Sequence, residues 1–192
     1  MMKEIFVLLE RCLGCRSCEL ACAVEHSRTR SLFTAIYEKP VPRKRLYVEP
    51  REGTELPLAL PLTCRHCEDA PCIAACVPGA MYRTPEGTVT NVGGPQECIG
   101  CAWCNMVCPF GVIGLGQDVD GKVIAIKCDL CPDRDIPACV EACPTKALVY
   151  MEADEFVKQK LRPKAAAAIS EAMVRREDIG ADLARKGGYE SR

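Results

Sequence analysis

The residues of this chain that could do chemistry are its sixteen cysteines. In the run from Cys98 to Cys108, two gaps of two residues and one of three separate four cysteines, and Pro109 follows. Three thiolates spaced two residues apart can wrap a loop around one corner of a cubane iron-sulfur cluster, and the fourth then reaches a second cluster. One such run therefore implies a partner run.

Three further runs repeat this spacing with variations. The first run has the same gaps without the proline, the second widens the middle gap to four residues, and the fourth widens it to seven. Each widened gap holds a proline shortly before the third cysteine, Pro71 or Pro137. The runs use every cysteine of the chain: Cys12, Cys15, Cys18 and Cys22; Cys64, Cys67, Cys72 and Cys76; Cys98, Cys101, Cys104 and Cys108; Cys128, Cys131, Cys139 and Cys143.

Length and composition limit the class of protein. At 192 residues the chain is one domain or two small ones. A net charge of −1 indicates no nucleic-acid partner. Residues 1–10 contain neither a long apolar region nor a small-residue cleavage site, so we predict a cytoplasmic protein whose thiols bind metal rather than form disulfides.

Two alternative interpretations concern the same cysteines. Residues 98–117 carry no charge and are long enough to span a bilayer, but four cysteines, Asn105 and Pro109 argue against a span, and we interpret the stretch as the lining of a buried cluster. Zinc sites also use pairs of closely spaced cysteines, but they have no use for a crossing fourth cysteine followed by proline. We therefore expect no direct membrane span and no structural zinc.

Three other side chains lie near the ligands in sequence. His26 and His66 flank cysteines, but sixteen thiolates already complete four clusters, so neither is expected to bind iron. We expect His66 to donate a hydrogen bond from behind the ligands. Trp103 is expected to pack beside a cluster.

Short strands are predicted before and after the first run. Residues 3–9 are rich in branched and aromatic apolar side chains, which indicates a strand. In the long segment between the first and second runs, residues 45–49 and 54–60 flank a turn at 50–53 and predict a hairpin. The basic run Arg43–Arg45 at its edge is interpreted as a solvated loop, with a docking patch as the alternative.

An internal repeat follows the second and third runs. After the second run, two short strands are predicted around the turn Pro85-Glu86-Gly87. After the third, residues 112–119 and 122–127 flank Asp120-Gly121, a strong hairpin signal. Asp118 and Asp120 belong to this hairpin, because the motif stops short of a calcium loop. Run, helix and hairpin thus recur.

Residues 151–192 contain no cysteine and form the second predicted domain, after a first domain at 1–150. Residues 154–184 are predicted to be helical, with Pro163 starting a second segment and Gly187-Gly188 ending it. One face carries a narrow apolar stripe of Ala165, Ile169, Ala172 and Met173. The helix either packs on its own domain or grips a partner subunit.

Linker length gives a first indication of which runs share clusters. The short linker from Cys76 to Cys98, with a glycine turn in its middle, suits a pair formed by the second and third runs. That pairing leaves the first and fourth runs for each other. The linker between the third and fourth runs has a similar length, so length alone leaves both pairings open.

Three segments carry a resemblance to a known family: Cys15 to His26, Cys64 to Cys72, and Cys108 to Gly111. With the four spacings, they resemble the four-cluster ferredoxin-like electron-transfer subunits of molybdenum or tungsten oxidoreductases, hydrogenase and formate-hydrogen complexes, and carbon monoxide dehydrogenase systems. The iron-sulfur subunit associated with carbon monoxide dehydrogenase is the most similar. This sequence departs from the pattern by lacking a proline after Cys22 and by having Val77-Pro78 after Cys76, and neither change removes a ligand.

The resemblance implies an α+β fold of two nested dicluster ferredoxin-like modules with short β-hairpins, followed by a helical C-terminal extension. The first run then pairs with the fourth and the second with the third. With crossed fourth cysteines, four [4Fe-4S] clusters are held by four ligand sets. We name them set A (Cys12, Cys15, Cys18, Cys143), set B (Cys22, Cys128, Cys131, Cys139), set C (Cys64, Cys67, Cys72, Cys108) and set D (Cys76, Cys98, Cys101, Cys104).

The loaded protein is expected to be more acidic than its sequence. Each oxidised cubane with four thiolates carries a charge of about −2. Cations next to ligands in sequence can offset this charge: Arg11, Arg16, Arg65, Lys127 and Lys146.

The expected function is electron transfer without catalysis. The sequence lacks the dinucleotide fingerprint, the phosphate-binding loop and the zinc-protease motif. The chain is expected to carry single low-potential electrons, in anaerobic metabolism, between a catalytic oxidoreductase and a second redox partner. By the resemblance these are carbon monoxide dehydrogenase and a hydrogenase or flavin-dependent NAD(P) reductase. The alternatives are a molybdenum or tungsten enzyme as the catalytic partner, such as formate dehydrogenase or aldehyde oxidoreductase, and an iron-sulfur redox sensor or scaffold.

Overall fold

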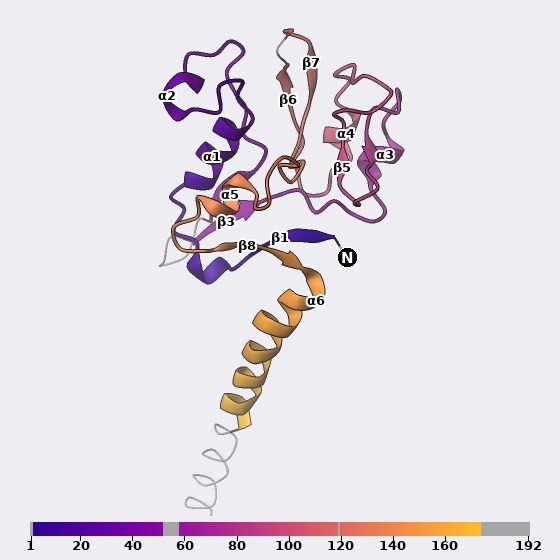
Figure 1. The fold of residues 1–192 in the computed structure, drawn as a ribbon. Helices are drawn as coiled ribbons and strands as arrows, with labels where there is room; N and C mark the ends of the chain where they lie inside the picture. Colours follow the sequence, from indigo (N-terminus) through magenta and orange to yellow (C-terminus); the bar gives the residue numbers. More distant parts are fainter. Residues whose placement is uncertain (1, 52–57, 119, 174–192) are drawn as a thin grey trace, which may run out of the picture. The chain divides into compact units, whose positions relative to one another are not determined.

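The computed structural model describes residues 2–51, 58–118 and 120–173. The chain divides into two compact units, the first ending at Met151 and the second beginning at Glu152 (Figure 1). In the described part of the first unit, short helices alternate with four two-stranded sheets, so the predicted α+β class is confirmed.

The first strand, β1 (Lys3–Val7), confirms the strand predicted over residues 3–9, although the chain turns into a short 3-10 helix, η1 (Leu9–Arg11), earlier than expected. Helix α1 (Ser17–Glu25) follows and carries two cysteines of the first run. β1 pairs with β8 (Leu148–Glu152), a strand that the sequence analysis did not predict (Figure 1). The pairing places the start of the chain beside the segment that follows the fourth run.

The long segment after α1 contains a short helix, α2 (Leu32–Ala35), and a hairpin. Strands β2 (Tyr47–Arg51) and β3 (Leu58–Leu62) pair antiparallel, with Tyr47 opposite Leu62. The predicted hairpin is therefore confirmed, and its turn lies outside the described residues.

The predicted repeat of run, helix and hairpin is also confirmed. Both hairpins are antiparallel, and their turns lie at the predicted places. The first copy consists of α3 (Pro71–Ala74), β4 (Tyr82–Arg83) and β5 (Val89–Thr90), and the second of α4 (Trp103–Met106), β6 (Gly114–Gln117) and β7 (Val123–Ile126). The fourth run contributes α5 (Ala138–Glu141).

Two hydrophobic cores occupy the first unit, and each gathers cysteines from two runs. One core joins α1 to α5 and contains Ile5, Cys18, Cys22, Leu46, Val48, Cys139, Cys143 and Leu148 among others. The other joins α3 to α4 around Met81, Val89, Cys104, Ile113 and Ala125, with Cys72, Cys76, Cys98 and Cys108 packed against it. Cysteines that are distant in sequence therefore share each interior.

The described residues of the second unit are helical from Ala153 onward. α6 (Ala153–Phe156) continues as a π-helical turn, η2 (Val157–Leu161), and residues 162–173 are again α-helical. The predicted second segment thus begins beside Pro163, at residue 162, although the chain stays helical between the two segments. The wider π turn that precedes it accommodates the proline, which has no N–H to donate.

The predicted apolar stripe of this helix is exposed to solvent. Ile169 and Met173 are each 61% exposed. The predicted helix end at Gly187-Gly188 lies outside the described residues. No helix within the described ranges is long and apolar enough to cross a bilayer.

Candidate iron-sulfur sites

The four cysteines of set A line one hollow of the first unit. Cys12 and Cys15 come from the loop after η1, Cys18 from α1, and Cys143 from the segment after α5. Cys15 is exposed, and the Ser17 hydroxyl 3.4 Å from its sulfur lowers its pKa. Cysteines of the first and fourth runs thus meet at one site.

The four cysteines of set D line a second hollow, whose described lining contains no charged side chain. Cys101 is exposed and Cys104 is buried on α4. Gly100 and Ala102 on either side of Cys101 have φ values of 67° and 66°. Gly14 and Arg16 around Cys15 have values of 67° and 59°, so the two ligand loops repeat one backbone conformation.

The cysteines of set B lie close enough to influence one another's ionisation. Burial raises the pKa of Cys139, and the neighbouring Cys128, Cys22 and Cys131 raise it further. Burial likewise raises the pKa of Cys22, to about 12, with Cys131 adding to the effect. α1 therefore directs Cys18 toward set A and, one turn later, Cys22 toward the fourth run.

The cysteines of set C are partly buried. Burial raises the pKa of Cys72, and the neighbouring Cys64 and Cys108 raise it further. The fourth member, Cys67, lies in a loop held by Arg83, whose guanidinium donates to the carbonyls of Cys67 and Glu68. Cys64 also raises the pKa of Cys128, so sets B and C are neighbours.

Backbone N–H groups point at five of the cysteine sulfurs. Such N–H···S bonds stabilise negative charge on sulfur and tune the potential of a bound cluster. The donors and sulfurs are Arg45 and Cys22 (3.2 Å), His66 and Cys64 (3.4 Å), Met81 and Cys76 (3.2 Å), Ala125 and Cys98 (3.4 Å), and Ala147 and Cys143 (3.2 Å). At least one sulfur in each of the four sets is supported in this way.

Burial of the cysteine side chains determines whether their thiols are protonated. It raises the pKa of Cys18 and of Cys104 to about 11, so these buried thiols stay protonated at neutral pH unless a cation replaces the proton. Metal binding to cysteine releases such protons. Groups of four converging thiols, supported by N–H donors, fit clusters of iron and sulfide.

His66 provides an independent test of that fit. It is buried, and its Nδ1 accepts a hydrogen bond of 3.0 Å from the Val89 N–H. Burial, followed by the charge of Lys127, lowers the pKa of His66 to about 3, so the ring is neutral and its proton lies on Nε2. This N–H has no acceptor among the described residues. A sulfide or thiolate of a cluster bound by set C would supply one, which agrees with the predicted role of His66 as a donor.

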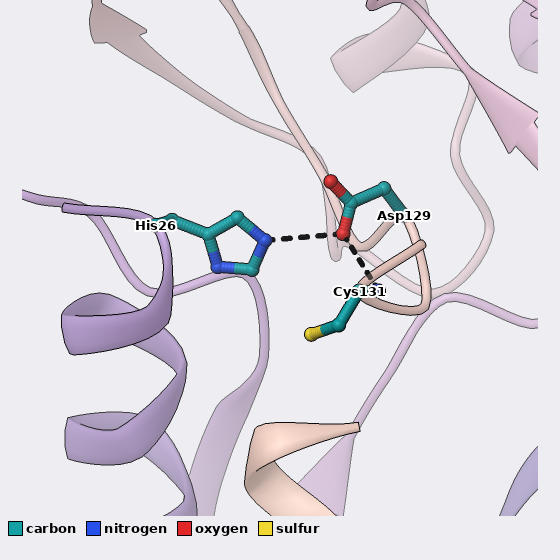
Figure 2. A group of neighbouring side chains, drawn as sticks. All are labelled: His26, Asp129 and Cys131. Carbon is teal, nitrogen blue, oxygen red and sulfur yellow. Dashed lines mark hydrogen bonds and ion pairs between the residues drawn. The ribbon is translucent and has the colours of Figure 1, made fainter. Parts of the chain in front are cut away.

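A network of charged side chains supports set B, and the sequence analysis missed it. Figure 2 shows the His26 ring pointing at Asp129, whose Oδ1 accepts from His26 Nε2 and from the Cys131 N–H, each at 3.1 Å. The other carboxylate oxygen accepts from the Arg45 guanidinium. Burial works against ionisation of Asp129, but the His26 hydrogen bond and the Arg45 charge hold its pKa below the ordinary value.

His26, Asp129 and Cys131 have ligating atoms within 4.8 Å of one another, a spacing that could hold a metal ion. Each atom already has a role, however. Asp129 is committed to Arg45 and His26, and Cys131 belongs to the predicted set B. We therefore interpret the group as support for set B. The acidic residue between the cysteines of Cys128-Asp-Leu-Cys131 was the available sequence signal.

The basic run also differs from its interpretation as a solvated loop. Lys44 pairs with Glu19 of α1 at 2.6 Å, and Arg45 pairs with Asp129. Glu19, buried between cysteines of the first run, accepts in addition from the Val48 N–H at 2.7 Å. Two of the three cations therefore tie this segment to α1 and to the fourth run, and of the three only Arg43 is exposed.

The uncharged stretch at 98–117 is the lining of a hollow only in part: Cys98, Cys101 and Cys104 line the hollow of set D, and Val112 and Ile113 are buried, but other side chains are exposed. Ile99 is 60% exposed, Met106 73% and Trp103 52%. Short loops around a cluster have too few residues to bury their own side chains. The absence of charge here marks an apolar surface around the exposed Cys101.

Comparisons with known proteins agree with these sites. Residues 57–153 match the family model described as a 4Fe-4S dicluster domain. The chain is 42% identical over 165 residues to an iron-sulfur protein of Rhodospirillum rubrum, covering 79% of this chain and 83% of that protein. It is 36% identical to the electron transport protein HydN of Escherichia coli (81% and 91% covered). Identity to the thiosulfate reductase electron transfer subunit PhsB of Salmonella typhi is 34% (79% and 76% covered).

The family model spans the second, third and fourth runs, and the relatives extend over about four fifths of the chain. Converging thiols, N–H donors to sulfur and the unmatched Nε2–H of His66 are the features that a cluster-binding protein requires. The chain belongs to the 4Fe-4S dicluster domain family of ferredoxin-like iron-sulfur proteins.

Proposed function

We propose that the chain is an electron-transfer subunit that binds four [4Fe-4S] clusters and connects a catalytic oxidoreductase to a second redox partner. The observation that carries this proposal is the succession of cysteine groups. Sets A and D line separate hollows, and Cys64 of set C neighbours Cys128 of set B. Bound clusters supply one-electron carriers, and this succession supports a linear order A, B, C, D.

The nested arrangement of the runs is part of the proposal. Packing of α1 on α5 and of α3 on α4 supports it, as does the pairing of β1 with β8. The rival pairing of the third run with the fourth would require Cys143 near the third run, whereas Cys143 lines the hollow of the first. We therefore assign the crossed ligand sets A to D as the binding residues.

Exposure indicates where electrons enter and leave. Cys15 in set A and Cys101 in set D are the two exposed cysteines, and no cysteine of sets B and C is exposed. Around Cys101 the surface is apolar, with Ile99 and Trp103 exposed, whereas Arg16 lines the hollow of set A. We propose that different proteins dock at the two ends, because the two surfaces differ in charge.

The partners are proposed from the relatives and the resemblance. The relatives are an electron transport protein and a reductase's electron transfer subunit, which supports a non-catalytic role. We retain carbon monoxide dehydrogenase as one candidate partner, from the motif resemblance, with a hydrogenase or flavin-dependent reductase at the other end. The similarity to PhsB supports a catalytic subunit of another oxidoreductase as the second candidate.

Anaerobic reconstitution tests the cofactor content. We expect about sixteen iron and sixteen sulfide per chain, because sixteen thiolates form four complete sets. Reduction monitored by electron paramagnetic resonance should then resolve reversible low-potential signals. An iron content near eight, or stoichiometric zinc, would contradict four clusters.

Affinity purification from the native host tests the partners. Co-purifying oxidoreductase subunits that reduce the clusters with their own substrate would identify the catalytic partner, and cell fractionation of the same material tests the predicted cytoplasmic location. If only regulatory proteins co-purify and no substrate reduces the clusters, a sensor or scaffold role replaces electron transfer.

A further inference from the structure

Lys127 is a buried cation at the junction of the two modules. It follows β7 and immediately precedes Cys128, and only 2% of its surface is exposed. Its Nζ donates to two main-chain carbonyls, those of Val89 and Cys128, the latter at 2.7 Å. Carbonyl oxygens satisfy the N–H donors of the ammonium but do not neutralise its charge.

No carboxylate in the described part of the chain forms an ion pair with this ammonium. Within the described ranges, none of the ion pairs includes Lys127. The carboxylate nearest in sequence, Asp129, is bound to Arg45 and His26. A buried ammonium without a counter-charge is strongly unfavourable, so native proteins place an anion beside it.

The position of Lys127 shows which anions are available. Its contact with the Cys128 carbonyl places it beside set B. Its other acceptor, Val89, donates its own N–H to His66, which lies between Cys64 and Cys67 of set C. The positive charge of Lys127 also acts on Cys72 of set C. The ammonium therefore lies between the two inner ligand sets.

We propose that Lys127 is a positioning residue for electron transfer, whose fixed positive charge is compensated by the clusters of sets B and C and stabilises their reduced states. The inference rests on the proposed function and extends it. A cluster gains one negative charge on reduction, so a nearby buried cation favours the reduced form, and water does not screen it. Because one ammonium serves both sets, it keeps the potentials of the two inner clusters high together.

Potentiometric titration of the loaded full-length protein, followed by electron paramagnetic resonance, tests this role. Lys127→Met keeps the length and apolar stem of the side chain but removes its charge. We expect the ratio of oxidised to reduced cluster at a fixed potential to rise at least tenfold at both inner sites, which is 59 mV for a one-electron couple. Lys127→Arg should leave both within a few-fold of the parent.

Lys122→Met is the matched control, because Lys122 lies on the same hairpin but is exposed and paired with Glu97. It should leave the inner clusters unchanged. If Lys127→Met does not assemble its clusters, Lys127→Gln, which keeps a donor for the two carbonyls, takes its place. Unchanged inner potentials in a fully loaded Met or Gln variant would overturn the proposal. Iron content and reversible reduction of the parent protein test the four-cluster function separately.

Discussion

The two modules hold their cysteines together by different means. In the first module, proposed to contain sets A and B, charged side chains connect distant segments: Glu19 to Lys44, Asp129 to Arg45 and His26, and Glu25 to Arg134. In the second, proposed to contain sets C and D, the described ion pair next to a ligand run joins two exposed side chains, Glu97 and Lys122, and the hydrophobic core consists of apolar side chains and cysteines.

The difference follows from the distance along the chain. The first module joins runs separated by more than a hundred residues, as in the pairs Glu25–Arg134 and His26–Asp129. Closing such a long loop costs more entropy, and apolar contacts alone leave many alternative pairings open. A buried charge is stable only beside its counter-charge, so it can specify which segments pair with each other. The second module closes a short linker, for which turns and apolar packing suffice.

Substitution of a cysteine ligand should produce the largest effect. It tests which cysteine runs share a cluster within each module. Cys22→Ala and Cys139→Ala should perturb the same electron paramagnetic resonance signal, because we assign both to set B. Cys18→Ala, one helical turn before Cys22, should perturb a different signal. If Cys22→Ala and Cys18→Ala instead change one signal, the fourth cysteine does not cross and the nested modules are wrong.

Removal of a charged side chain should have the second-largest effect, and this effect should differ between the two modules. Asp129→Asn leaves Arg45, whose side chain is only 16% exposed, without its counter-charge, and we expect a loss of about 3 kcal/mol. The readout is the guanidinium midpoint for loss of cluster absorbance under anaerobic conditions. Glu97→Gln is the control in the second module, where the carboxylate is 84% exposed, and its midpoint should not move. Equal shifts in both variants would remove the distinction between the modules.

Equivalent glycines in the two ligand loops provide a finer test. Gly14→Ala and Gly100→Ala both force a side chain into a left-handed conformation, at a cost of about 1 kcal/mol. At Gly100 the new Cβ would lie 2.5 Å from the Val123 carbonyl oxygen, whereas at Gly14 it would lie 3.1 Å from the Ala59 Cβ. We therefore expect a lower guanidinium midpoint for Gly100→Ala than for Gly14→Ala. The opposite order would mean that the β7 backbone moves away easily.

Deletion of residues 154–192 should have the smallest effect on the modules. It removes no cysteine, so iron content and the guanidinium midpoint should match those of the full chain. We expect weaker association with at least one partner, because Ile169 and Met173 are exposed apolar side chains of this unit. Size-exclusion chromatography with the purified partner measures this. Unchanged complex formation would assign the helix to its own unit alone, and loss of iron would assign it to the cluster-binding modules.

Spacing and turn signals predicted much of the fold. The cysteine runs predicted the iron-sulfur family, and the turns at Gly87 and Gly121 predicted two hairpins, because glycine and its neighbours determine such turns locally. Strand β8 was not predicted, since its role is to pair with β1, which lies at the other end of the first unit. Pairing across such a distance leaves no local signal.

The supporting residues of the site were harder to predict than the ligands. Asp129 and Glu19 look like ordinary charged residues in sequence, and only the folded chain shows that each is buried against a cation. Trp103 was expected to pack beside a cluster because aromatic residues usually seek apolar contacts. Trp103 begins the short helix α4, and its side chain stays half exposed.

One consequence for evolution follows from the short helices that carry the third and fourth cysteine of each run. In all four runs these cysteines are four residues apart, at or just after α1, α3, α4 or α5, so helical geometry fixes the rise between them at about 6 Å. Under crossed ligation this rise helps set the spacing of neighbouring carriers. Surface loops can then diverge to suit new enzymes while the internal spacing is inherited unchanged.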